Sequence, residues 1–549
     1  MSPLRAALLP LLLAATLLAA PRPKLVVVLS VDQFSAELME RWGKDLPGGL
    51  GRLYRGGTTF VEAYHDHGFT ETGPGHSVLL TGRHPMHTGI VENTWLDPAT
   101  GKRVYCVADP ASAILGAPAG TPGVGPKNLQ GDTLGSWLVA QVPGSRVFAV
   151  TGKDRSAILM AGQHGQGVYW FAGAQGFTSS RAYTDTLPPW LQAFNSRFLS
   201  RLEHASLFWE PLDARPLPPG GSYQIHGRSL TLGLPRTILA VGMPRDMAFW
   251  DRFRASPFLD EAILGAADAL AAGEHLGQGP ATDLLALGLT ATDYVGHDFG
   301  NGGPEMLDHL RRLDRNLGLF LDRLHARVPG LWVVLTADHG SADFPERLQA
   351  QGLPAKRLMA GPWQQELNRE LSRRLGLAGN LFRPSDNSQQ LNLDPDLLRT
   401  CGRTRAEALK AAVAVAKAMP EVAEACSADD LEALTPDAQE PPDHRSYATR
   451  LRLSYLAGRS ADLSIAFKPM YAMDASDHLA THGHPQDTDR RVPLVFWGPW
   501  RAEERTEPVR TVDLAATLAQ ELGLRPQEAI DGRPLALKPT GKAHPQARK

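Results

Sequence analysis

Three carboxylates and three imidazoles of this sequence are candidates for binding divalent metals. They occur as Asp32, as Asp293-x-x-x-His297, as the adjacent pair Asp338-His339, and as one imidazole of Thr481-His482-Gly483-His484. Carboxylates and imidazoles together suit Zn²⁺, and three protein ligands with an open position are typical of a catalytic zinc. Because six such ligands are too many for one zinc, the set predicts two metals that share them with a nucleophile.

A hydroxyl at the start of a predicted helix is the candidate nucleophile. Thr72 is followed by Gly-Pro-Gly, and Pro74 favours the first turn of a helix that continues through Leu80. A hydroxyl there faces unpaired backbone N–H groups, where a phosphate also binds well. A divalent metal in contact with it would favour the alkoxide. The alternatives are that Thr72 only caps the helix, or that Thr70 or Ser77 supplies the hydroxyl.

Six short apolar runs predict the strands that position these groups. They span residues 24–31, 146–150, 237–241, 283–289, 331–335 and 492–497. Continuous apolar runs suit strands that are covered by helices on both faces. The leucine spacing over 304–327 predicts a helix between two of these strands. The alternation predicts an α/β fold with a doubly wound, mostly parallel sheet sandwiched by helices.

Ionisable residues follow four of the predicted strands directly. They are Asp32, the Thr151-Gly-Lys-Asp-Arg155 segment, Asp293 and Asp338. In a doubly wound sheet, ligands bind outside the carboxyl ends of the strands. Loops are polar in any protein, but acidic and basic side chains at four separate strand ends favour convergence on one crevice.

Composition limits the classes of protein that this chain could be. Among 549 residues, 43% are hydrophobic and 21% are charged, which is ordinary for a globular protein. The net charge is -2 with no long single-sign block. Nucleic-acid coats and polybasic membrane binders need a large positive field, so we expect no nucleic-acid partner.

The amino-terminal residues predict export. Arg5 precedes an apolar run over 6–20 that ends in small residues, as in a secretory signal peptide cleaved near Ala20. The alternative is a membrane anchor, but the run is shorter than the about 20 residues that a bilayer needs. We therefore expect a periplasmic or secreted protein without stable membrane insertion. Residues 21–549 are expected to form one catalytic domain with cap insertions at about 157–236 and 341–480.

The sequence contains three cysteines, too few for a disulfide framework. After export, Cys401 and Cys426 could pair and leave Cys106 free, or all three could remain thiols.

The motifs VLSVDQ, TGPGHS, HTGIVENTW, TGKDRSA, TDYVGH and TADHG together resemble the alkaline phosphatase superfamily. They are most similar to its PafA-like branch of secreted phosphomonoesterases with a threonine nucleophile. The resemblance runs in order across residues 24 to about 500. It implies a doubly wound α/β domain that holds two zinc ions, although the sequence also admits other divalent metals.

The resemblance also implies individual roles. One zinc would be held by Asp293, His297 and His482, and the other by Asp32, Asp338, His339 and the Thr72 oxygen. The residues implied around the phosphoryl oxygens are Asn93, Lys153 and Arg155. Two departures stand out. This chain reads Glu92-Asn93-Thr94-Trp95 where the family has Gly-Asn-Asn-Trp, and His484 competes with His482, which the family pattern Thr-His-Gly favours.

Lys153 and Arg155 favour a phosphate monoester as the substrate. A monoester presents a dianionic group with three terminal oxygens, whereas a diester carries one negative charge and a second carbon substituent. Two fixed cations and an amide donor fit the extra charge. We expect hydrolysis of small-molecule monoesters through a phospho-threonine intermediate, with release of inorganic phosphate. The sequence leaves the oligomeric state open.

Other functions remain as alternatives. A phosphodiesterase or nucleotide pyrophosphatase of the same superfamily is the nearest, and an exported phosphate-ligand binder without turnover is another. A sulfatase is disfavoured because no Cys/Ser-x-Pro-x-Arg segment supplies its nucleophile. The predicted export argues against a cytoplasmic phosphomutase.

Overall fold

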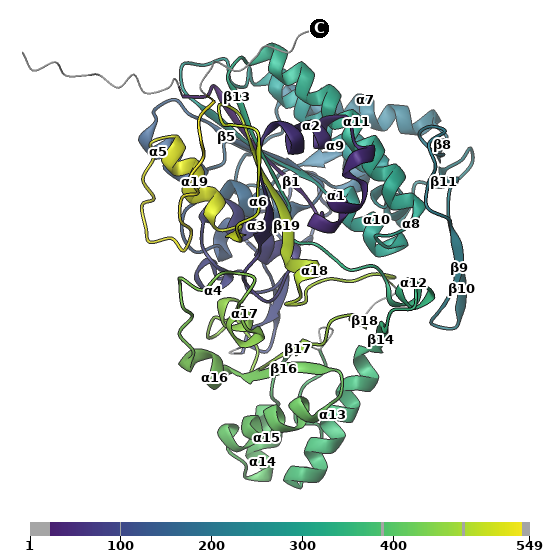
Figure 1. Cartoon of the computed structure of the whole chain (residues 1–549), viewed down its shortest axis with the longest axis vertical. Coiled ribbons are helices and arrows are strands. Elements are labelled where there is room, and N and C mark those ends of the chain that lie inside the picture. The colour runs from purple at the N-terminus through teal and green to yellow at the C-terminus, as the bar shows by residue number, and fades with distance from the viewer. Residues whose placement is uncertain (1–21, 99, 386–388, 475–477, 541–549) are drawn as a thin grey trace, which may run out of the picture.

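The computed structural model describes residues 22–98, 100–385, 389–474 and 478–540, so the predicted signal peptide lies outside the described residues. A ten-stranded sheet forms the centre of the molecule, in the order β20-β2-β19-β13-β1-β12-β5-β6-β7, with β21 also paired to β2 (Figure 1). Its strands are β1 (Leu25–Val31), β2 (Thr58–Tyr64), β5 (Val147–Thr151), β6 (Gly167–Phe171), β7 (Phe177–Thr178), β12 (Asp283–Leu289), β13 (Leu331–Thr336), β19 (Arg491–Trp497), β20 (Glu503–Arg505) and β21 (Val509–Arg510).

The middle of this sheet is parallel. β13, β1, β12, β5 and β6 are neighbours that all run in the same direction. In contrast, β19 runs antiparallel to both β13 and β2, and β7 runs antiparallel to β6. The carboxyl ends of β1, β5, β12 and β13 therefore lie along one edge of the sheet, where the predicted site residues follow them.

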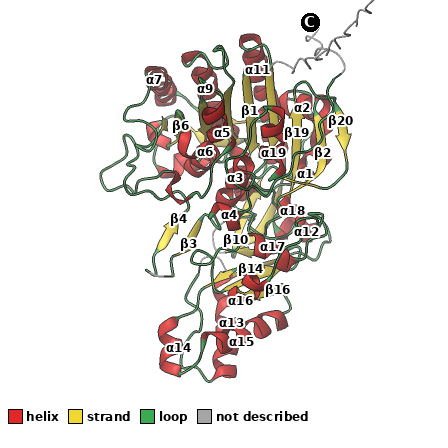
Figure 2. Cartoon of the chain, turned by 90° about the vertical axis from the view of Figure 1, so that its left-hand side faces the viewer, coloured by secondary structure: helices red, strands yellow, loops and turns green. Residues whose placement is uncertain are grey.

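Helices cover both faces of the sheet, as its apolar strands require (Figure 2). In β1, Leu25, Val27 and Leu29 face one buried cluster, and Val26 and Val28 face the other. The first cluster includes residues of α1 (Ala36–Trp42), α2 (Gly49–Gly56), α7 (Pro189–His204), α8 (Met247–Arg254), α9 (Pro257–Gly273) and α11 (Pro304–Arg327). The second includes residues of α3 (Thr72–Thr81), α5 (Leu134–Gln141), α6 (Asp154–Ala161) and α19 (Asp513–Glu521). The predicted α/β sandwich and the predicted helix over 304–327 are confirmed.

Two predictions about the fold are wrong. The run at 237–241 is not a strand of the central sheet: β11 (Arg236–Leu239) pairs antiparallel with β8 (Leu207–Trp209) in a separate sheet, and Val241 is 89% exposed. Apolar residues in β11 are buried against the helical layer, and apolarity alone does not reveal which partner buries a strand. The predicted insertion at 157–236 also starts too early, because β6 and β7 belong to the central sheet.

A smaller body lies within the predicted insertion at 341–480. It contains a sheet in the order β15-β17-β16 and a buried cluster of its own (Figure 1). Its strands are β15 (Gln390–Leu391), β16 (Val422–Ser427) and β17 (Leu463–Phe467), and its helices are α13 (Ala360–Leu375), α14 (Pro395–Cys401) and α15 (Arg405–Ala418). Nearby are β14 (Lys356–Met359), β18 (Tyr471–Asp474), α12 (Pro345–Ala350), α16 (Ala428–Ala433) and α17 (Tyr447–Leu453).

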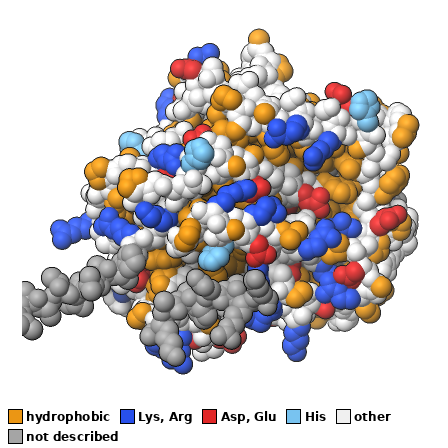
Figure 3. Space-filling view, turned by 90° about the horizontal axis from the view of Figure 1, so that it is seen from above, with side chains coloured by type: hydrophobic (Ala, Val, Ile, Leu, Met, Phe, Trp, Pro, Cys, Tyr) orange, Lys and Arg blue, Asp and Glu red, His pale blue; other side chains and the backbone are white. Residues whose placement is uncertain are grey.

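Three further observations bear on the sequence-based expectations. Cys106, Cys401 and Cys426 are all free thiols, so Cys401 and Cys426 do not pair in this structure. Among the described residues, no helix has the length and apolarity needed to cross a membrane. On the face opposite the small insertion body, acidic and basic side chains are interspersed with hydrophobic ones (Figure 3).

Candidate active site and metal centre

Four strand ends bring charged residues to one place. Asp32 directly follows β1, Asp338 follows β13, and Asp293 lies in the first turn of α10 (Ala291–Phe299), the helix after β12. Lys153 precedes α6, just after β5. Its Nζ lies 2.7 Å from Asp32 Oδ2 and 2.6 Å from Asp293 Oδ2. One ammonium group therefore joins carboxylates from two different strand ends.

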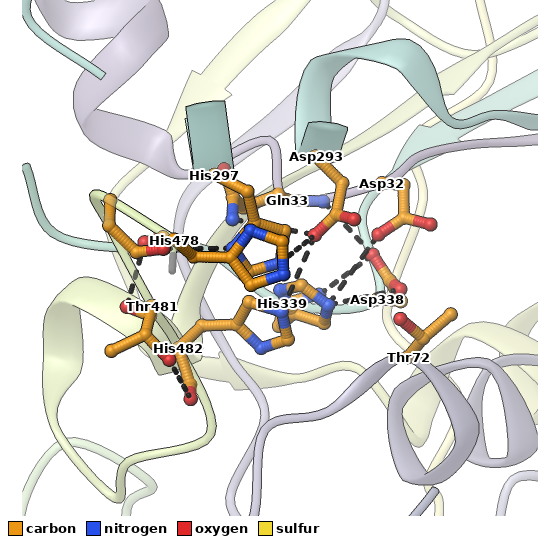
Figure 4. A network of polar contacts seen from close by, with 12 residues as sticks. Asp32, Gln33, Thr72, Asp293, His297, Asp338, His339, His478, Thr481 and His482 are labelled. Atoms are coloured by element: carbon orange, nitrogen blue, oxygen red, sulfur yellow. Dashed lines mark hydrogen bonds and ion pairs between the residues drawn. The ribbon is translucent and has the colours of Figure 1, made fainter. Parts of the chain in front are cut away.

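The first candidate metal group consists of Asp32, Asp338 and His339. His339 Nε2 lies 3.5 Å from Asp32 Oδ1 and 3.3 Å from Asp338 Oδ2, and all three side chains are wholly buried. One possible ligand atom of each lies within 4.8 Å of the others. These are the protein ligands that the resemblance implies for the zinc beside Thr72, and Figure 4 shows Thr72 next to Asp338.

The second candidate group gathers around Asp293. Asp293 Oδ1 lies 3.3 Å from His297 Nε2 and 3.4 Å from His482 Nε2. The ring of His482 stacks on that of His339 at a centroid distance of 3.7 Å, so the two groups adjoin each other (Figure 4). Asp293, His339 and His482 also offer ligand atoms within 4.8 Å of one another.

Backbone carbonyl groups fix the orientation of all three imidazoles. His297 Nδ1 lies 2.8 Å from Ala480 O, His482 Nδ1 lies 2.9 Å from Thr70 O, and His339 Nδ1 lies 3.1 Å from Gly340 O. A carbonyl oxygen only accepts, so each Nδ1 carries the hydrogen and each Nε2 presents a lone pair. Such second contacts are typical of histidines that bind metals.

These lone pairs provide a test of whether the residues fit a cation. His339 Nε2 is buried, has no hydrogen-bond partner, and faces carboxylate oxygens of Asp32 and Asp338. A lone pair facing a carboxylate is repulsive unless a proton or a cation lies between them. Burial lowers the pKa of His339 well below its ordinary value, which disfavours the proton. The donor set therefore fits a divalent metal such as zinc.

The charge balance of the site leads to the same conclusion. Burial, followed by the neighbouring Asp338 carboxylate, raises the pKa of Asp32 well above its ordinary value. Burial also acts to raise the pKa of Asp293, but Lys153 and then His297 overcome it and hold that pKa low. Among the described residues, Lys153 is the only lysine or arginine that forms ion pairs within this group of three carboxylates, and it pairs with Asp32 and Asp293. Bound divalent cations would supply the missing positive charge.

Thr72 is the first residue of α3 and does not cap it, because Glu71 occupies the cap position. Thr72 Oγ1 lies 3.4 Å from Lys153 Nζ and 3.3 Å from Arg155 Nη2. The two rival hydroxyls are engaged elsewhere: Thr70 donates to His484 O, and Ser77 donates to Pro74 O. Thr72 is therefore the hydroxyl that faces the cationic side chains.

Asn93 and Arg155 are each held by a neighbour. Asn93 Oδ1 accepts a 2.7 Å hydrogen bond from the Gly73 backbone N–H, which leaves the Asn93 amide group as a donor. Arg155 Nη1 lies 3.5 Å from the Tyr105 hydroxyl, which donates to Asp154 at 2.6 Å. The structure thus brings Asn93, Lys153 and Arg155 around the start of α3.

Sequence reasoning assigned no role to His76 and Gln33. His76 Nδ1 lies 2.9 Å from Thr72 O and 3.1 Å from Asp338 Oδ2. Its position four residues after Thr72, on the same helix face, was the available signal. The Gln33 backbone N–H donates to Asp338, and its side chain donates to Asp293. No pattern in the sequence indicated these contacts.

The structure also separates the two competing imidazoles near residue 483. His482 lies beside Asp293, whereas His484 Nδ1 lies 3.2 Å from Asp489 Oδ2 and the His484 backbone N–H donates to the same oxygen.

Gly75 has a separate role in the packing of the site. A Cβ atom there would lie 2.0 Å from Asp338 O, so only glycine lets α3 approach the Asp338 backbone.

Comparison with known proteins places these residues in a family context. The model of the family described as type I phosphodiesterase / nucleotide pyrophosphatase matches residues 26–488. Alkaline phosphatase PhoK from Sphingomonas sp is 36% identical over 95% of this chain and 92% of its own length. Alkaline phosphatase PafA from Elizabethkingia meningoseptica is 30% identical over 94% of this chain and 94% of its own length.

Solved structures of PafA resemble this chain along almost its whole length. The crystal structure of wild-type PafA gives a TM-score of 0.82 with 29% identity, covering 94% of this chain and 99% of PafA. A PafA variant in which a threonine, an asparagine, a lysine and an arginine are substituted gives a TM-score of 0.80 with 27% identity and the same coverage.

Proposed function

This chain belongs to the type I phosphodiesterase / nucleotide pyrophosphatase family of the alkaline phosphatase superfamily and is a phosphatase, and we propose that it hydrolyses phosphate monoesters through Thr72. The observation that carries the proposal is the position of the Thr72 hydroxyl. It lies within 3.4 Å of Lys153 Nζ, and the same Nζ contacts carboxylates of both candidate metal groups.

In the proposed reaction, Thr72 Oγ1 attacks phosphorus in line with the leaving alcohol. The bond from phosphorus to the ester oxygen breaks, and the phosphoryl group is left on Thr72. Water then attacks the phospho-threonine, which releases inorganic phosphate and restores the hydroxyl. Asn93, Lys153 and Arg155 hold the three equatorial oxygens, so their contribution is orientation and electrostatic stabilisation.

We propose that the resident cofactor is a pair of Zn²⁺ ions. Asp32, Asp338 and His339 would hold one ion near Thr72, and Asp293, His297 and His482 would hold the other. When bound, such ions lower the pKa of a coordinated hydroxyl or water and stabilise a leaving oxygen. The protein's own contribution is to fix the imidazoles through the carbonyl groups of Gly340, Ala480 and Thr70.

The PafA variant supports the assignment of the four substrate-facing residues. Its substituted residues are a threonine, an asparagine, a lysine and an arginine. The lysine and arginine stand two positions apart there, as Lys153 and Arg155 do in this chain. The spacing between the threonine and the asparagine also equals the spacing between Thr72 and Asn93.

The second candidate function is phosphodiester or pyrophosphate hydrolysis. The description of the matching family, type I phosphodiesterase / nucleotide pyrophosphatase, favours it. We prefer the monoester because Lys153 and Arg155 both face Thr72 Oγ1 and match the dianionic charge of a monoester.

We further propose a periplasmic or secreted location, small-molecule esters as substrates, and a single catalytic domain over residues 21–549.

Comparing two ester classes tests this proposal. The purified protein should hydrolyse 4-nitrophenyl phosphate with a higher kcat/KM than bis(4-nitrophenyl) phosphate. Lys153→Ala and Arg155→Ala should reduce monoester turnover more than diester turnover, and the matched control Lys127→Ala, at an exposed lysine, should change neither. Acid quenching and mass spectrometry should find phosphate on Thr72. A preference for the diester, or an equal loss for both esters, would exclude the monoester assignment.

A further inference from the structure

A pocket of about 200 Å³ is lined by Glu92 and Thr94, the two sequence neighbours of Asn93. One wall is formed by β3 (Thr94–Leu96) and β4 (Arg103–Tyr105), which pair antiparallel, together with Glu92. The opposite wall belongs to the insertion and includes Arg383, Gln390 and Arg459. The pocket has room for several water molecules or for one carboxylate or phosphate group.

Both walls are tied to the catalytic loops. On one side, the Asn93 backbone N–H donates to Glu71, the residue before the nucleophile, at 2.6 Å. On the other side, Gln389 donates to Gly483 O at 3.1 Å, and Gly483 directly follows His482. Glu92 and Gln390, which line the pocket, are the sequence neighbours of Asn93 and Gln389. Both walls of the pocket therefore adjoin residues that are hydrogen-bonded to the loops of the reaction site.

Arg459 supplies a pre-positioned positive charge to this pocket. Its Nη1 donates to Asn128 O at 2.8 Å and to Gly89 O, and its guanidinium lies over the ring of Trp95 at 5.1 Å. Within the described part of the chain, no carboxylate forms an ion pair with Arg459. Burial lowers the pKa of Arg459. Such a fixed guanidinium loses little entropy when it binds an anion.

The other charged residues of the lining leave the pocket positive. Arg383 is half-buried and, in the ranges that the structure describes, has no carboxylate partner. Among the described residues that line the pocket, Glu92 is the single acidic one, and burial followed by the Glu71 carboxylate raises its pKa well above the ordinary value. The lining also contains Arg103 and the amides of Gln390 and Asn392. Arginine side chains with amide donors suit a carboxylate or a phosphate.

We propose that this pocket binds a second anionic group of the substrate, so that the preferred substrates are phosphate monoesters whose alcohol carries a carboxylate or another phosphate. Arg383 and Arg459 would contact this group and act as specificity-determining residues. The inference rests on the proposed monoesterase function and extends it to a class of substrate. Turnover of phenyl phosphate, which has no second anionic group, tests the function alone.

Two matched substrate pairs test the inference with the wild-type protein. The first pair is 4-carboxyphenyl phosphate and 4-carbamoylphenyl phosphate, which differ in charge at nearly constant size. The second is propane-1,3-diol bisphosphate and propane-1,3-diol monophosphate. At least one anionic member should have a kcat/KM about tenfold above that of its partner. The pair that shows the preference identifies the second group as a carboxylate or a phosphate. Ratios near one in both pairs would overturn the inference, even if phenyl phosphate is hydrolysed.

Variants of Arg383 locate the effect. Arg383→Gln should bring the preferred ratio close to one and leave kcat/KM for phenyl phosphate unchanged, whereas Arg383→Lys should retain part of the preference. The matched control is Arg399→Gln, an exposed arginine of α14 in the same insertion. An unchanged ratio in a folded Arg383→Gln protein would overturn the assignment. The wild-type ratios decide the main question even if that variant does not fold.

Discussion

The imidazole of His76 lies 3.1 Å from the carboxylate of Asp338, and both side chains are wholly buried. The same imidazole nitrogen lies 2.9 Å from the carbonyl oxygen of Thr72. His76 therefore links the residue proposed as nucleophile to a carboxylate proposed as a metal ligand. Because α3 and β13 are distant in sequence, this contact fixes the relative position of the two parts of the site.

Replacing His76 should weaken both metal binding and catalysis. His76→Ala frees the Asp338 carboxylate and the first turn of α3, so we expect kcat/KM and metal affinity to fall by about 10–100-fold. Steady-state kinetics and metal analysis of the purified protein measure the two effects. His164→Ala, at an exposed histidine, is the control. Unchanged metal content together with unchanged kinetics would show that His76 does not position Asp338.

Removing the Thr72 hydroxyl should abolish turnover and leave the fold intact. Thr72→Val keeps the side-chain shape at the start of α3, so the melting temperature should change little, whereas kcat should fall at least about 10³-fold. Thr72→Ser should retain part of the activity because it keeps a hydroxyl. Thr70→Val serves as the control, since it removes a nearby buried hydroxyl that donates to His484 O. Full activity of Thr72→Val would exclude a phospho-threonine at this position.

Removing divalent metal should reduce both activity and stability. Asp32 and Asp293 share the Lys153 ammonium group, and Asp338 lies beside Asp32, so the mutual repulsion of these carboxylates is expected to increase when cations are withdrawn. With free metal at about 1,000 times its Kd, bound metal stabilises a fold by about 4 kcal/mol. Treatment with a chelator should lower the melting temperature and stop phosphate release, and added Zn²⁺ should restore both. A melting temperature that is insensitive to chelator would contradict the metal assignment.

Stability should decline in the alkaline range because of a histidine outside the reaction site. His84 Nε2 lies 2.9 Å from Asp66 Oδ1, and His84 Nδ1 lies 3.3 Å from Asp531 Oδ2. Burial acts to lower the pKa of His84, but Asp66 and Asp531 overcome it and raise the pKa from 6.5 to about 9. The protonated form is thus favoured in the folded state, so this stabilisation is complete below pH 6.5 and is lost as the pH rises through 9.

The size of this effect can be measured directly. A shift of the pKa from 6.5 to about 9 corresponds to about 3 kcal/mol. Chemical unfolding at several pH values should therefore show the wild-type protein losing stability relative to His84→Gln between pH 6.5 and 10. His204→Gln, at an exposed position, should follow the wild type throughout. A constant difference between wild type and His84→Gln over this range would refute the linkage.

Much of the sheet could be predicted from local sequence. The runs that became β1, β5, β12, β13 and β19 are continuous and apolar because helices or other strands cover both faces. β2, whose run TTFVEAY mixes polar and apolar residues, and the short β6 were not predicted. The run that became β11 looked like a central strand, because burial against a helix layer requires the same apolar residues as burial within a sheet.

The sequence by itself determined which chemical groups this protein brings to its site. Asp32, Lys153, Asp293 and Asp338 follow buried strands, and in a parallel sheet the carboxyl ends of neighbouring strands must lie along one edge. That argument needs only the local pattern and the direction of the strands. It does not depend on the details of side-chain packing.

Only the tertiary structure decided which residues outside those strand ends complete the site. It placed His482 beside Asp293 and His484 beside Asp489, although the two histidines are two residues apart. It also brought His76 to Asp338, and Arg383 and Arg459 to the pocket near Asn93. These contacts join segments that no local periodicity relates, and they depend on how the loops and the insertion pack against the sheet.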